Sequence, residues 1–429
     1  MTSHSAKPLA IITYSIAGLG HLRVATALSQ AAPPELDSLV LSSGDSWLSA
    51  GHGIMSNSRL LRTVFEFMQY GIPEKIVTIL IKHYVRLFSS QAKNQIISIV
   101  KSQPSFPSEL ILVGTHFMLT EQLSFQKQDL SRKLGIPVKI YLQVTDDTIQ
   151  PIWYIRGVDR MIVPSPHVAD SFKTYADNHH LPLIPISICP YPVSPRLTET
   201  LTPKNIAHRT SEYTSSTSLE IAIPLSGATV GADFLAQLAS QLPAGFHSTF
   251  IAKTSSSLAS IKSLTSHNPQ VSLIETDTSS ATINAYEQYY QDHVVGAEIT
   301  KPSEQAFKVL APHSRVGGSI LFFVHPVGRQ EYENLTFLTR YHFIPTSVEH
   351  QTLYHLAATH GELSTSLLQE ASNWRGLQLP SDSREAANFI VWSRESGLLT
   401  AMGDTLPREP ELQPDGAARF WQAVLTSQE

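Results

Sequence analysis

The sequence has 429 residues, of which 42% are hydrophobic and 16% charged, and its net charge is -5. These values exclude a disordered or fibrous chain, and at this length two domains of roughly 200 residues each are expected. The acidic balance, without any run of Lys or Arg, argues against a nucleic-acid partner. The single cysteine, Cys189, excludes an intramolecular disulfide and any multi-cysteine metal site.

The amino-terminal segment, residues 1–8, is short and polar, and the apolar run at 9–14 is too brief for the core of a signal peptide. No apolar run elsewhere in the sequence approaches the roughly 18–20 residues that a membrane-spanning helix requires. We therefore expect a cytoplasmic protein without a spanning helix. Peripheral attachment at the inner face of the membrane stays open.

Short apolar segments alternate with helical patterns along the first half of the chain. A helix is expected at 22–30, and a loop that enters a helix at 165–172. Parallel strands covered by helices on both faces produce this pattern, so we predict a Rossmann-like domain over residues 1–198. The expected strands are 9–14, 38–43, 109–114, 137–144 and 159–164.

The composition changes at 199–218, where Thr, Ser, Pro and charged residues replace the apolar periodicity, and this indicates a linker. A second Rossmann-like domain is predicted over 219–345, followed by a helical extension at 346–429 that packs on the domains. The fold class is therefore expected to be α/β, with two Rossmann-like domains facing a central cleft, because open α/β sheets bind ligands at their strand ends. The expected strands of the second domain include 219–225, 248–252 and 319–324.

A Gly-Leu-Gly-His loop follows the first predicted strand. Gly18 and Gly20 allow the backbone to approach a ligand, and the N–H groups at the start of the next helix attract an anion. Arg23 stands where a dinucleotide-binding motif requires its third glycine, so no nicotinamide cofactor is expected. The alternative is a tight turn that leaves His21 facing solvent.

Four segments stand in the order and spacing of one set of known motifs. They are Ser-Ile-Ala-Gly-Leu-Gly-His from Ser15, Val-Thr-Asp-Asp from Val144, Glu-Ile-Thr-Lys-Pro from Glu298, and Pro-Val-Gly-Arg-Gln-Glu from Pro326. With them the chain resembles the monogalactosyldiacylglycerol synthase and processive diacylglycerol glucosyltransferase group. The resemblance implies a GT-B fold with an acceptor-side first domain. It also implies a nucleotide-diphosphate sugar donor, such as a UDP-sugar, held mainly by the second domain, and neither a metal nor another cofactor.

The donor side is expected in the second domain. Small residues after its first strand suit a cradle for the diphosphate, because backbone N–H groups bind anions there; a plain strand–helix turn is the alternative. Lys301 would supply positive charge to the leaving group, unless it is an ordinary exposed lysine. The cradle residues are Ser226, Gly227, Thr229 and Gly231. The residues that suit sugar hydroxyls, or alternatively an N-cap cluster of the next helix, are Gln330, Glu331 and Asn334.

The sequence departs from the family pattern in two places. The stretch after Lys301 is shorter and lacks the family's glycines, so the implied ribose-binding role falls to Glu304 at an altered spacing. Arg329 separates Gly328 from Gln330, which are adjacent in the family pattern. The donor sugar and its nucleotide therefore stay open.

Two residues are candidates for the general base that takes the acceptor's proton. Either His21 or Asp147 accepts a proton near neutral pH if its surroundings tune it, but a carboxylate with an unshifted pKa is a weak base for an alcohol. Asp147 would then orient the acceptor or a histidine. Asp146 competes with it for this role, and a helix cap is the structural alternative for both.

Residues 58–88 combine apolar periodicity with basic side chains, which predicts two amphipathic helices. A core-facing helical hairpin is the plain interpretation. The resemblance instead implies contact with a membrane surface, since a basic amphipathic face binds anionic headgroups and would admit a lipid acceptor.

The sequence thus predicts a metal-independent glycosyltransferase, a hexosyltransferase, that moves a sugar from a nucleotide-diphosphate donor to a hydroxyl acceptor. A membrane lipid is one such acceptor. The alternative is a non-catalytic GT-B-like protein that binds a nucleotide sugar or a glycolipid. A different group-transfer enzyme or an epimerase on the same fold also stays open, and the sequence leaves the stereochemical outcome and the oligomeric state undetermined.

Overall fold

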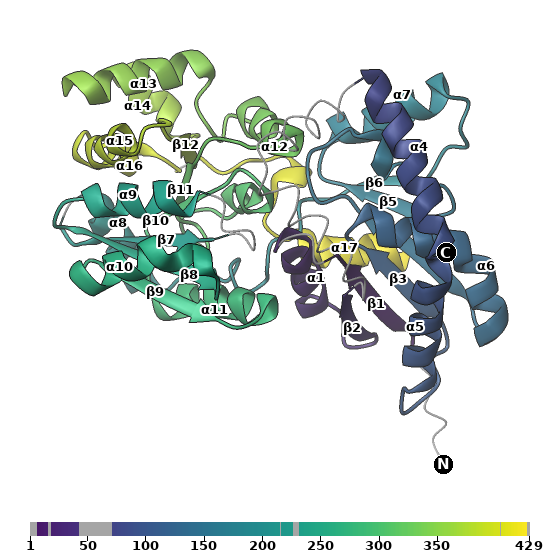
Figure 1. Ribbon diagram of the computed structural model, residues 1–429. Helices are drawn as coiled ribbons and strands as arrows, with labels where there is room; N and C mark the ends of the chain where they lie inside the picture. Colours follow the sequence, from purple (N-terminus) through teal and green to yellow (C-terminus); the bar gives the residue numbers. More distant parts are fainter. Residues whose placement is uncertain are drawn as a thin grey trace. The chain divides into compact units, whose positions relative to one another are not determined.

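The chain forms two compact units in a computed structural model that describes residues 7–15, 19–42, 71–214, 216–225, 231–403 and 405–426. The first unit comprises Met1–Pro195 together with Pro410–Glu429, and the second comprises Arg196–Glu409. Each unit has its own parallel sheet and its own hydrophobic core (Figure 1).

The first unit is built on a six-stranded sheet in the order β2-β1-β3-β4-β5-β6, with every neighbouring pair parallel. The central strands β1 and β3 are mainly apolar and almost entirely buried, as expected for strands that are covered on both faces. The strand order reverses between β1 and β3, and ligands of open α/β sheets bind at the carboxyl ends beside such a reversal. The strands are β1 (Leu9–Tyr14), β2 (Asp37–Ser42), β3 (Leu110–Gly114), β4 (Val138–Gln143), β5 (Arg160–Val163) and β6 (Ile186–Ile188).

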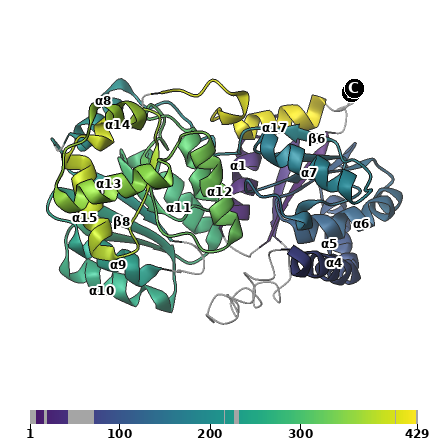
Figure 2. The same cartoon turned by 90° about the horizontal axis from the view of Figure 1, so that it is seen from above.

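The helices of the first unit include one from the far end of the sequence. Helix α17 (Gly416–Leu425) packs on α1, as Figures 1 and 2 show. The buried Trp421 donates its indole N–H to the Leu28 carbonyl oxygen over 2.7 Å. A Cβ atom at Gly416 would lie 2.3 Å from the Tyr191 carbonyl oxygen, so this close approach requires glycine. The other helices are α1 (Gly20–Gln30), α4 (Gly71–Leu87), α5 (Ser89–Lys101), α6 (Phe117–Leu134), the 3-10 turn η1 (Pro151–Trp153) and α7 (Pro166–Asn178).

The second unit repeats the architecture with a parallel sheet in the order β12-β11-β10-β7-β8-β9. Here the order reverses between β7 and β10, which marks the carboxyl ends of these strands as the place for a ligand. The strands are β7 (Leu219–Pro224), β8 (Phe246–Lys253), β9 (Val271–Thr276), β10 (Ala297–Thr300), β11 (Ile320–Phe323) and β12 (Gly376–Gln378).

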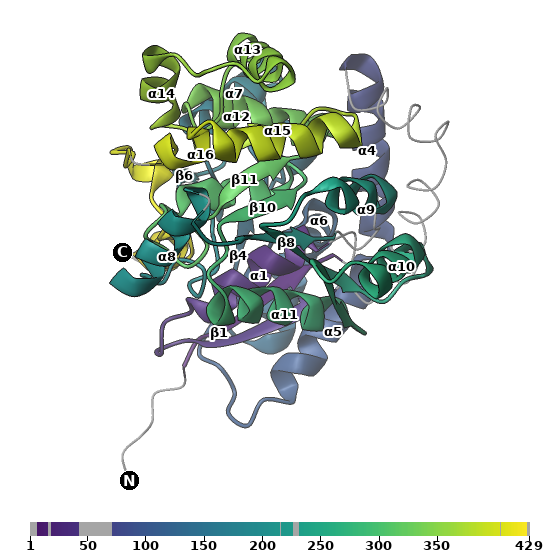
Figure 3. The ribbon, with the colours of Figure 1, turned by 90° about the vertical axis from the view of Figure 1, so that its left-hand side faces the viewer.

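Helices cover the second sheet, and α15 packs against both α9 and α13 (Figure 3). A buried histidine ties α13 to the edge strand, because His350 Nε2 accepts a hydrogen bond of 2.9 Å from the Gln378 N–H. The helices are α8 (Pro203–Tyr213), α9 (Ala232–Gln241), α10 (Ala259–His267), α11 (Ser279–Asp292), η3 (Glu304–Leu310), α12 (Arg329–Arg340), α13 (Ser347–Thr359), α14 (Thr365–Ala371), α15 (Ser383–Glu395) and α16 (Leu398–Ala401).

A buried arginine fastens helix α8 to the second unit. The Arg209 guanidinium is only 2% exposed and donates to the carbonyl oxygens of His313, Arg315 and Val316 at 2.6–2.7 Å. A buried cation costs free energy unless its donors find acceptors, and the loop carbonyls accept from both terminal nitrogens of Arg209. Residues 199–218 are therefore not a plain linker, since α8 lies within them and packs as part of the second unit.

The predicted fold class, α/β with two Rossmann-like domains, is confirmed. The boundaries differ at the carboxyl end, where the extension expected at 346–429 contains β12 of the second sheet and α17 of the first unit. Of the helical hairpin expected at 58–88, the part before Gly71 lies outside the described residues, and α4 forms the rest.

Candidate functional sites at the strand ends

His21 lies at the carboxyl edge of the first sheet, where α1 begins directly after β1. The Thr115 hydroxyl oxygen lies 3.1 Å from the carbonyl oxygens of both Thr13 and His21, which ties the start of the helix to the ends of β1 and β3. Gly20 is the first residue of α1, and Gly18 lies outside the described residues. His21, in the first turn of α1, therefore lies where the strand order reverses between β1 and β3.

Aromatic rings surround the His21 imidazole. The ring of His116 meets it edge-on at a centroid distance of 4.7 Å, and the fully buried Trp153 lies at 6.4 Å. His116 caps α6 because its Nδ1 accepts a hydrogen bond of 3.3 Å from the Met118 N–H, and its ring stacks on Phe117. Half-buried among these rings, His21 is not the solvent-facing residue of a simple turn.

Three buried polar residues follow β4 and reach the same edge. Thr145 Oγ1 lies 3.3 Å from His21 Nδ1 and 3.3 Å from Asp146 Oδ2. Asp147 instead accepts a hydrogen bond from the Ser165 hydroxyl, and Ser165 caps helix α7 through the Val168 N–H. Thr145 therefore links Asp146 to His21, and Asp147 contacts Ser165 at the start of α7.

A partly buried lysine holds the turn that carries Trp153. Lys82 Nζ of α4 donates to the carbonyl oxygens of Tyr154 at 2.7 Å and Pro151 at 3.3 Å. Burial lowers the pKa of Lys82 to about 8. The Lys82 amino group therefore stabilises the turn that places Trp153 beside His21.

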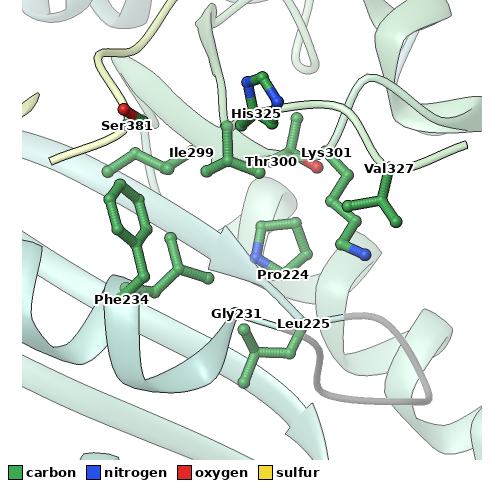
Figure 4. Close-up of a pocket in the computed structure, with 12 residues that line it drawn as sticks. Pro224, Leu225, Gly231, Phe234, Ile299, Thr300, Lys301, His325, Val327 and Ser381 are labelled. Carbon is green, nitrogen blue, oxygen red and sulfur yellow. The ribbon is translucent and has the colours of Figure 1, made fainter. Parts of the chain in front are cut away.

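A pocket of about 160 Å³ lies at the carboxyl ends of β7, β10 and β11 in the second unit (Figure 4). Its walls are mainly apolar, with polar groups from Thr300, Lys301, His325 and Ser381. In Figure 4 the Lys301 side chain extends beside Val327 at the margin of the pocket. The apolar lining residues are Pro224, Leu225, Phe234, Leu235, Ile299, Val324 and Val327.

The first turn of α9 forms another side of this pocket. Gly231 is the N-cap of α9, and its φ of 86° lies in the left-handed region that favours glycine. The N–H groups at such a helix start attract anions. The other predicted cradle residues, Ser226, Gly227 and Thr229, lie outside the described residues.

Two residues of α12 hold the loops that border the pocket. The fully buried Asn334 donates from Nδ2 to the Pro302 carbonyl oxygen over 3.1 Å. Glu331 Oε2 accepts a hydrogen bond of 2.6 Å from the Val327 N–H. Burial raises the pKa of Glu331, an effect that the charge of Lys301 opposes and that of Glu304 increases. Both α12 side chains therefore contact protein backbone, with Gln330 beside them in the first turn.

Among the residues that the structure describes, no group of three or more His, Cys, Asp or Glu side chains is placed to hold a metal ion. None of the helices in this part of the chain is both long and apolar enough to cross a membrane.

Two tandem Rossmann-like units, with the helix after the second returning to the first, form the GT-B class of architecture. No protein-family model and no curated protein matches the sequence. The chain is similar to several solved structures at low sequence identity.

The S. aureus MnaA–UDP complex is 7% identical with a TM-score of 0.49 over 98% of this chain and 96% of that one. UDP-GlcNAc 2-epimerase from Neisseria meningitidis, bound to UDP-GlcNAc, is 11% identical with a TM-score of 0.47 over 98% and 100%. A UDP-glucosyltransferase from Polygonum tinctorium is 12% identical with a TM-score of 0.43 over 99% of both chains.

Proposed function

We propose that the protein is a glycosyltransferase that moves a hexose from a nucleotide-diphosphate donor to a hydroxyl acceptor, with His21 as the general base. The observation that carries the proposal is the position of His21 at the strand-order reversal of the first sheet, beside buried Thr145 and edge-on to His116. A histidine in contact with buried polar groups at a ligand-binding edge is suited to proton transfer near neutral pH.

The pocket of the second unit is the proposed donor site. Its apolar walls suit the flat face of a nucleobase, while Lys301 and the start of α9 at Gly231 supply positive potential for the diphosphate. These groups would stabilise the leaving group without a metal ion. The residues proposed to complete the cradle are Ser226, Gly227 and Thr229, and those proposed for ribose and sugar hydroxyls are Glu304 and Gln330.

A non-catalytic protein that binds nucleotide sugars is the second candidate, and one observation favours it. Glu331 and Asn334, to which the family resemblance gives contacts with the donor sugar, are bonded to the backbone at Val327 and Pro302. A site that has lost its sugar ligands would still bind a nucleotide in the apolar pocket.

Turnover separates the two candidates. The purified protein is incubated with a panel of nucleotide sugars, and donor-dependent glycosylation or hydrolysis is measured beside nucleotide binding. We expect turnover with at least one donor, and a loss of about a hundredfold or more in His21→Ala with donor binding retained. Binding without turnover, unchanged in His21→Ala, would favour the non-catalytic protein.

We propose a membrane lipid as the acceptor class, with α4 as the contact surface. Its exposed apolar side chains include Ile79, Leu80 and Leu87, each at least 62% exposed. The basic residues of α4 add less than the sequence indicates, because Lys82 binds backbone carbonyls and Arg86 pairs with Glu121. Attachment would therefore depend mainly on apolar insertion.

Vesicle co-sedimentation tests the membrane proposal. The triple variant with Ser at Ile79, Leu80 and Leu87 should lose binding to anionic lipid vesicles, whereas Val348→Ser, which changes an equally exposed apolar residue of α13, should retain it. Equal sedimentation of the two variants would remove the proposal.

A further inference from the structure

A buried chain of polar atoms connects a carboxylate to the imidazole of His21. Thr145 Oγ1 lies at 3.3 Å from both Asp146 Oδ2 and His21 Nδ1. Thr145 is 2% exposed and Asp146 is 8% exposed, so water competes little for these contacts. Electrostatic interactions are stronger in such a setting than at the surface.

The direction of each hydrogen bond follows from the number of protons. An ionised carboxylate only accepts, whereas the threonine hydroxyl has one proton to donate and lone pairs to accept. A hydrogen bond to a charged acceptor is stronger than one to a neutral ring nitrogen, so the hydroxyl proton goes to Asp146. The lone pair of Thr145 Oγ1 then accepts a proton from His21 Nδ1. We infer that Thr145 and Asp146 together fix His21 in the tautomer with its proton on Nδ1 and its lone pair on Nε2.

The neighbouring histidine is held in the opposite form. His116 Nδ1 accepts the Met118 N–H, so the neutral ring of His116 carries its proton on Nε2. Protonating Nδ1 would remove the acceptor that caps α6, and this disfavours a positive charge on His116. His116 therefore presents an uncharged ring to His21 at a centroid distance of 4.7 Å. The Asp146 carboxylate, which accepts the hydrogen bond from Thr145, favours the charged form of His21.

The chemical consequence of this tautomer rests on the proposed function. In the transfer step the acceptor hydroxyl gives its proton to His21 Nε2 while its oxygen bonds to the anomeric carbon. The bond from that carbon to the diphosphate oxygen breaks, and the electron pair leaves with the diphosphate. The Nδ1 proton of the imidazolium stays hydrogen-bonded to Thr145 Oγ1, and the charge of Asp146 stabilises the imidazolium. Thr145 and Asp146 are thus positioning residues for His21.

The tautomer of His21 is measurable without any turnover. In the intact protein labelled with ¹⁵N-histidine, two-bond ¹⁵N–¹H correlation spectra distinguish a protonated from an unprotonated ring nitrogen. The chain has 18 histidines, so the His21 signals are identified as those missing from His21→Gln. Above the usual pKa of imidazole, we expect a protonated Nδ1 and an unprotonated Nε2. A proton on Nε2 in the wild-type protein would overturn the inference.

Three variants test the cause of the tautomer. Thr145→Val keeps the shape but lacks the hydroxyl, and it should shift His21 toward the Nε2 proton; Thr145→Ser should restore the wild-type pattern. Asp147→Asn is the matched control, because it changes the neighbouring carboxylate that contacts Ser165, and it should leave the tautomer unchanged. A wild-type tautomer in Thr145→Val would contradict the inference.

Kinetics supply a second readout if the transferase proposal holds. Thr145→Val should lower kcat by about tenfold or more with KM unchanged, and Thr145→Ser should recover most of it. The acid limb of the pH–rate profile should move to lower pH in Thr145→Val, because the imidazolium loses the acceptor of its Nδ1 proton. An unchanged kcat would contradict the positioning role. Absence of turnover in the wild-type protein would reject the proposed function alone, since the tautomer is measured independently.

Discussion

The Asn334 amide, buried in helix α12, donates a hydrogen bond of 3.1 Å to the carbonyl oxygen of Pro302. Pro302 directly follows Lys301, whose side chain borders the pocket of the second unit. The position of this lysine thus depends on a residue that never needs to touch a ligand. A side chain that resembles a sugar ligand in the sequence is, in the structure, a support for the pocket wall.

Asn334→Leu should weaken both stability and donor binding. The substitution leaves the Pro302 carbonyl without its donor, which costs roughly 1–3 kcal/mol for a buried group, and it frees the turn that carries Lys301. Denaturant unfolding measures the first effect and nucleotide titration the second. Gln330→Ala, in the same helix but with a side chain outside the core, should leave the free energy of unfolding nearly unchanged. Equal stability of the two variants would contradict this role of Asn334.

Lys82→Met should change how stability depends on alkaline pH. The folded pKa of Lys82 is lowered from 10.5 to about 8 by burial, so between these values the unfolded chain binds more protons than the folded one. The stability of the wild-type protein relative to Lys82→Met should therefore rise as pH increases through this window. Unfolding at several pH values in both proteins measures the difference. A constant difference would show that Lys82 is not shifted.

The buried His350 should make the second unit sensitive to acid. Burial lowers its pKa from 6.5 to about 4, and protonation of Nε2 would remove the acceptor of the Gln378 N–H. The stabilising contribution of the neutral ring is complete above pH 6.5 and should be lost as pH falls toward about 4. His350→Gln should show a flatter pH dependence over this range. The comparison uses unfolding midpoints, and parallel curves would count against the shift.

Trp421→Ala should destabilise the first unit strongly. The variant removes a buried aromatic side chain and its hydrogen bond to the Leu28 carbonyl, a loss of about 3–5 kcal/mol for large aromatic truncations. Phe106→Ala, which changes a half-exposed aromatic residue of the same unit, is the control and should cost little. Thermal unfolding of both variants tests the expectation, and similar melting temperatures would contradict it.

The sequence predicted five of the six strands of the first sheet and three of the six strands of the second, because buried parallel strands are short apolar runs whose pattern is local. It placed His21 and Asp147 after strands, and both do lie at carboxyl ends. It could not pair Thr145 with His21, because His21 lies in the first turn of α1 after β1 whereas Thr145 follows β4. Only the strand order brings these two places to one edge of the sheet. His116 was missed although it follows the central strand β3, and a polar residue directly after a buried strand was the available signal.

Residues whose type fits two different roles were the hardest to assign. Asn334 fits a sugar-binding motif and a buried support equally well by residue type, and only the packing of α12 separates them. In the same way, the Thr and Pro residues before α8 were interpreted as a linker, whereas Thr202 caps the helix and Pro203 begins it. Burial depends on residues distant in the sequence, so composition alone could not reveal it.

The return of α17 to the first unit also has a consequence for biosynthesis. During translation, α1 emerges early, but the helix that covers it at Leu28 is made only after all of the second unit. The nascent first unit therefore exposes the surface of α1 that α17 covers until the whole second unit has been synthesised. Ribosome-bound chains that stop before Pro410 should accordingly recruit chaperones more than chains that extend beyond Leu425.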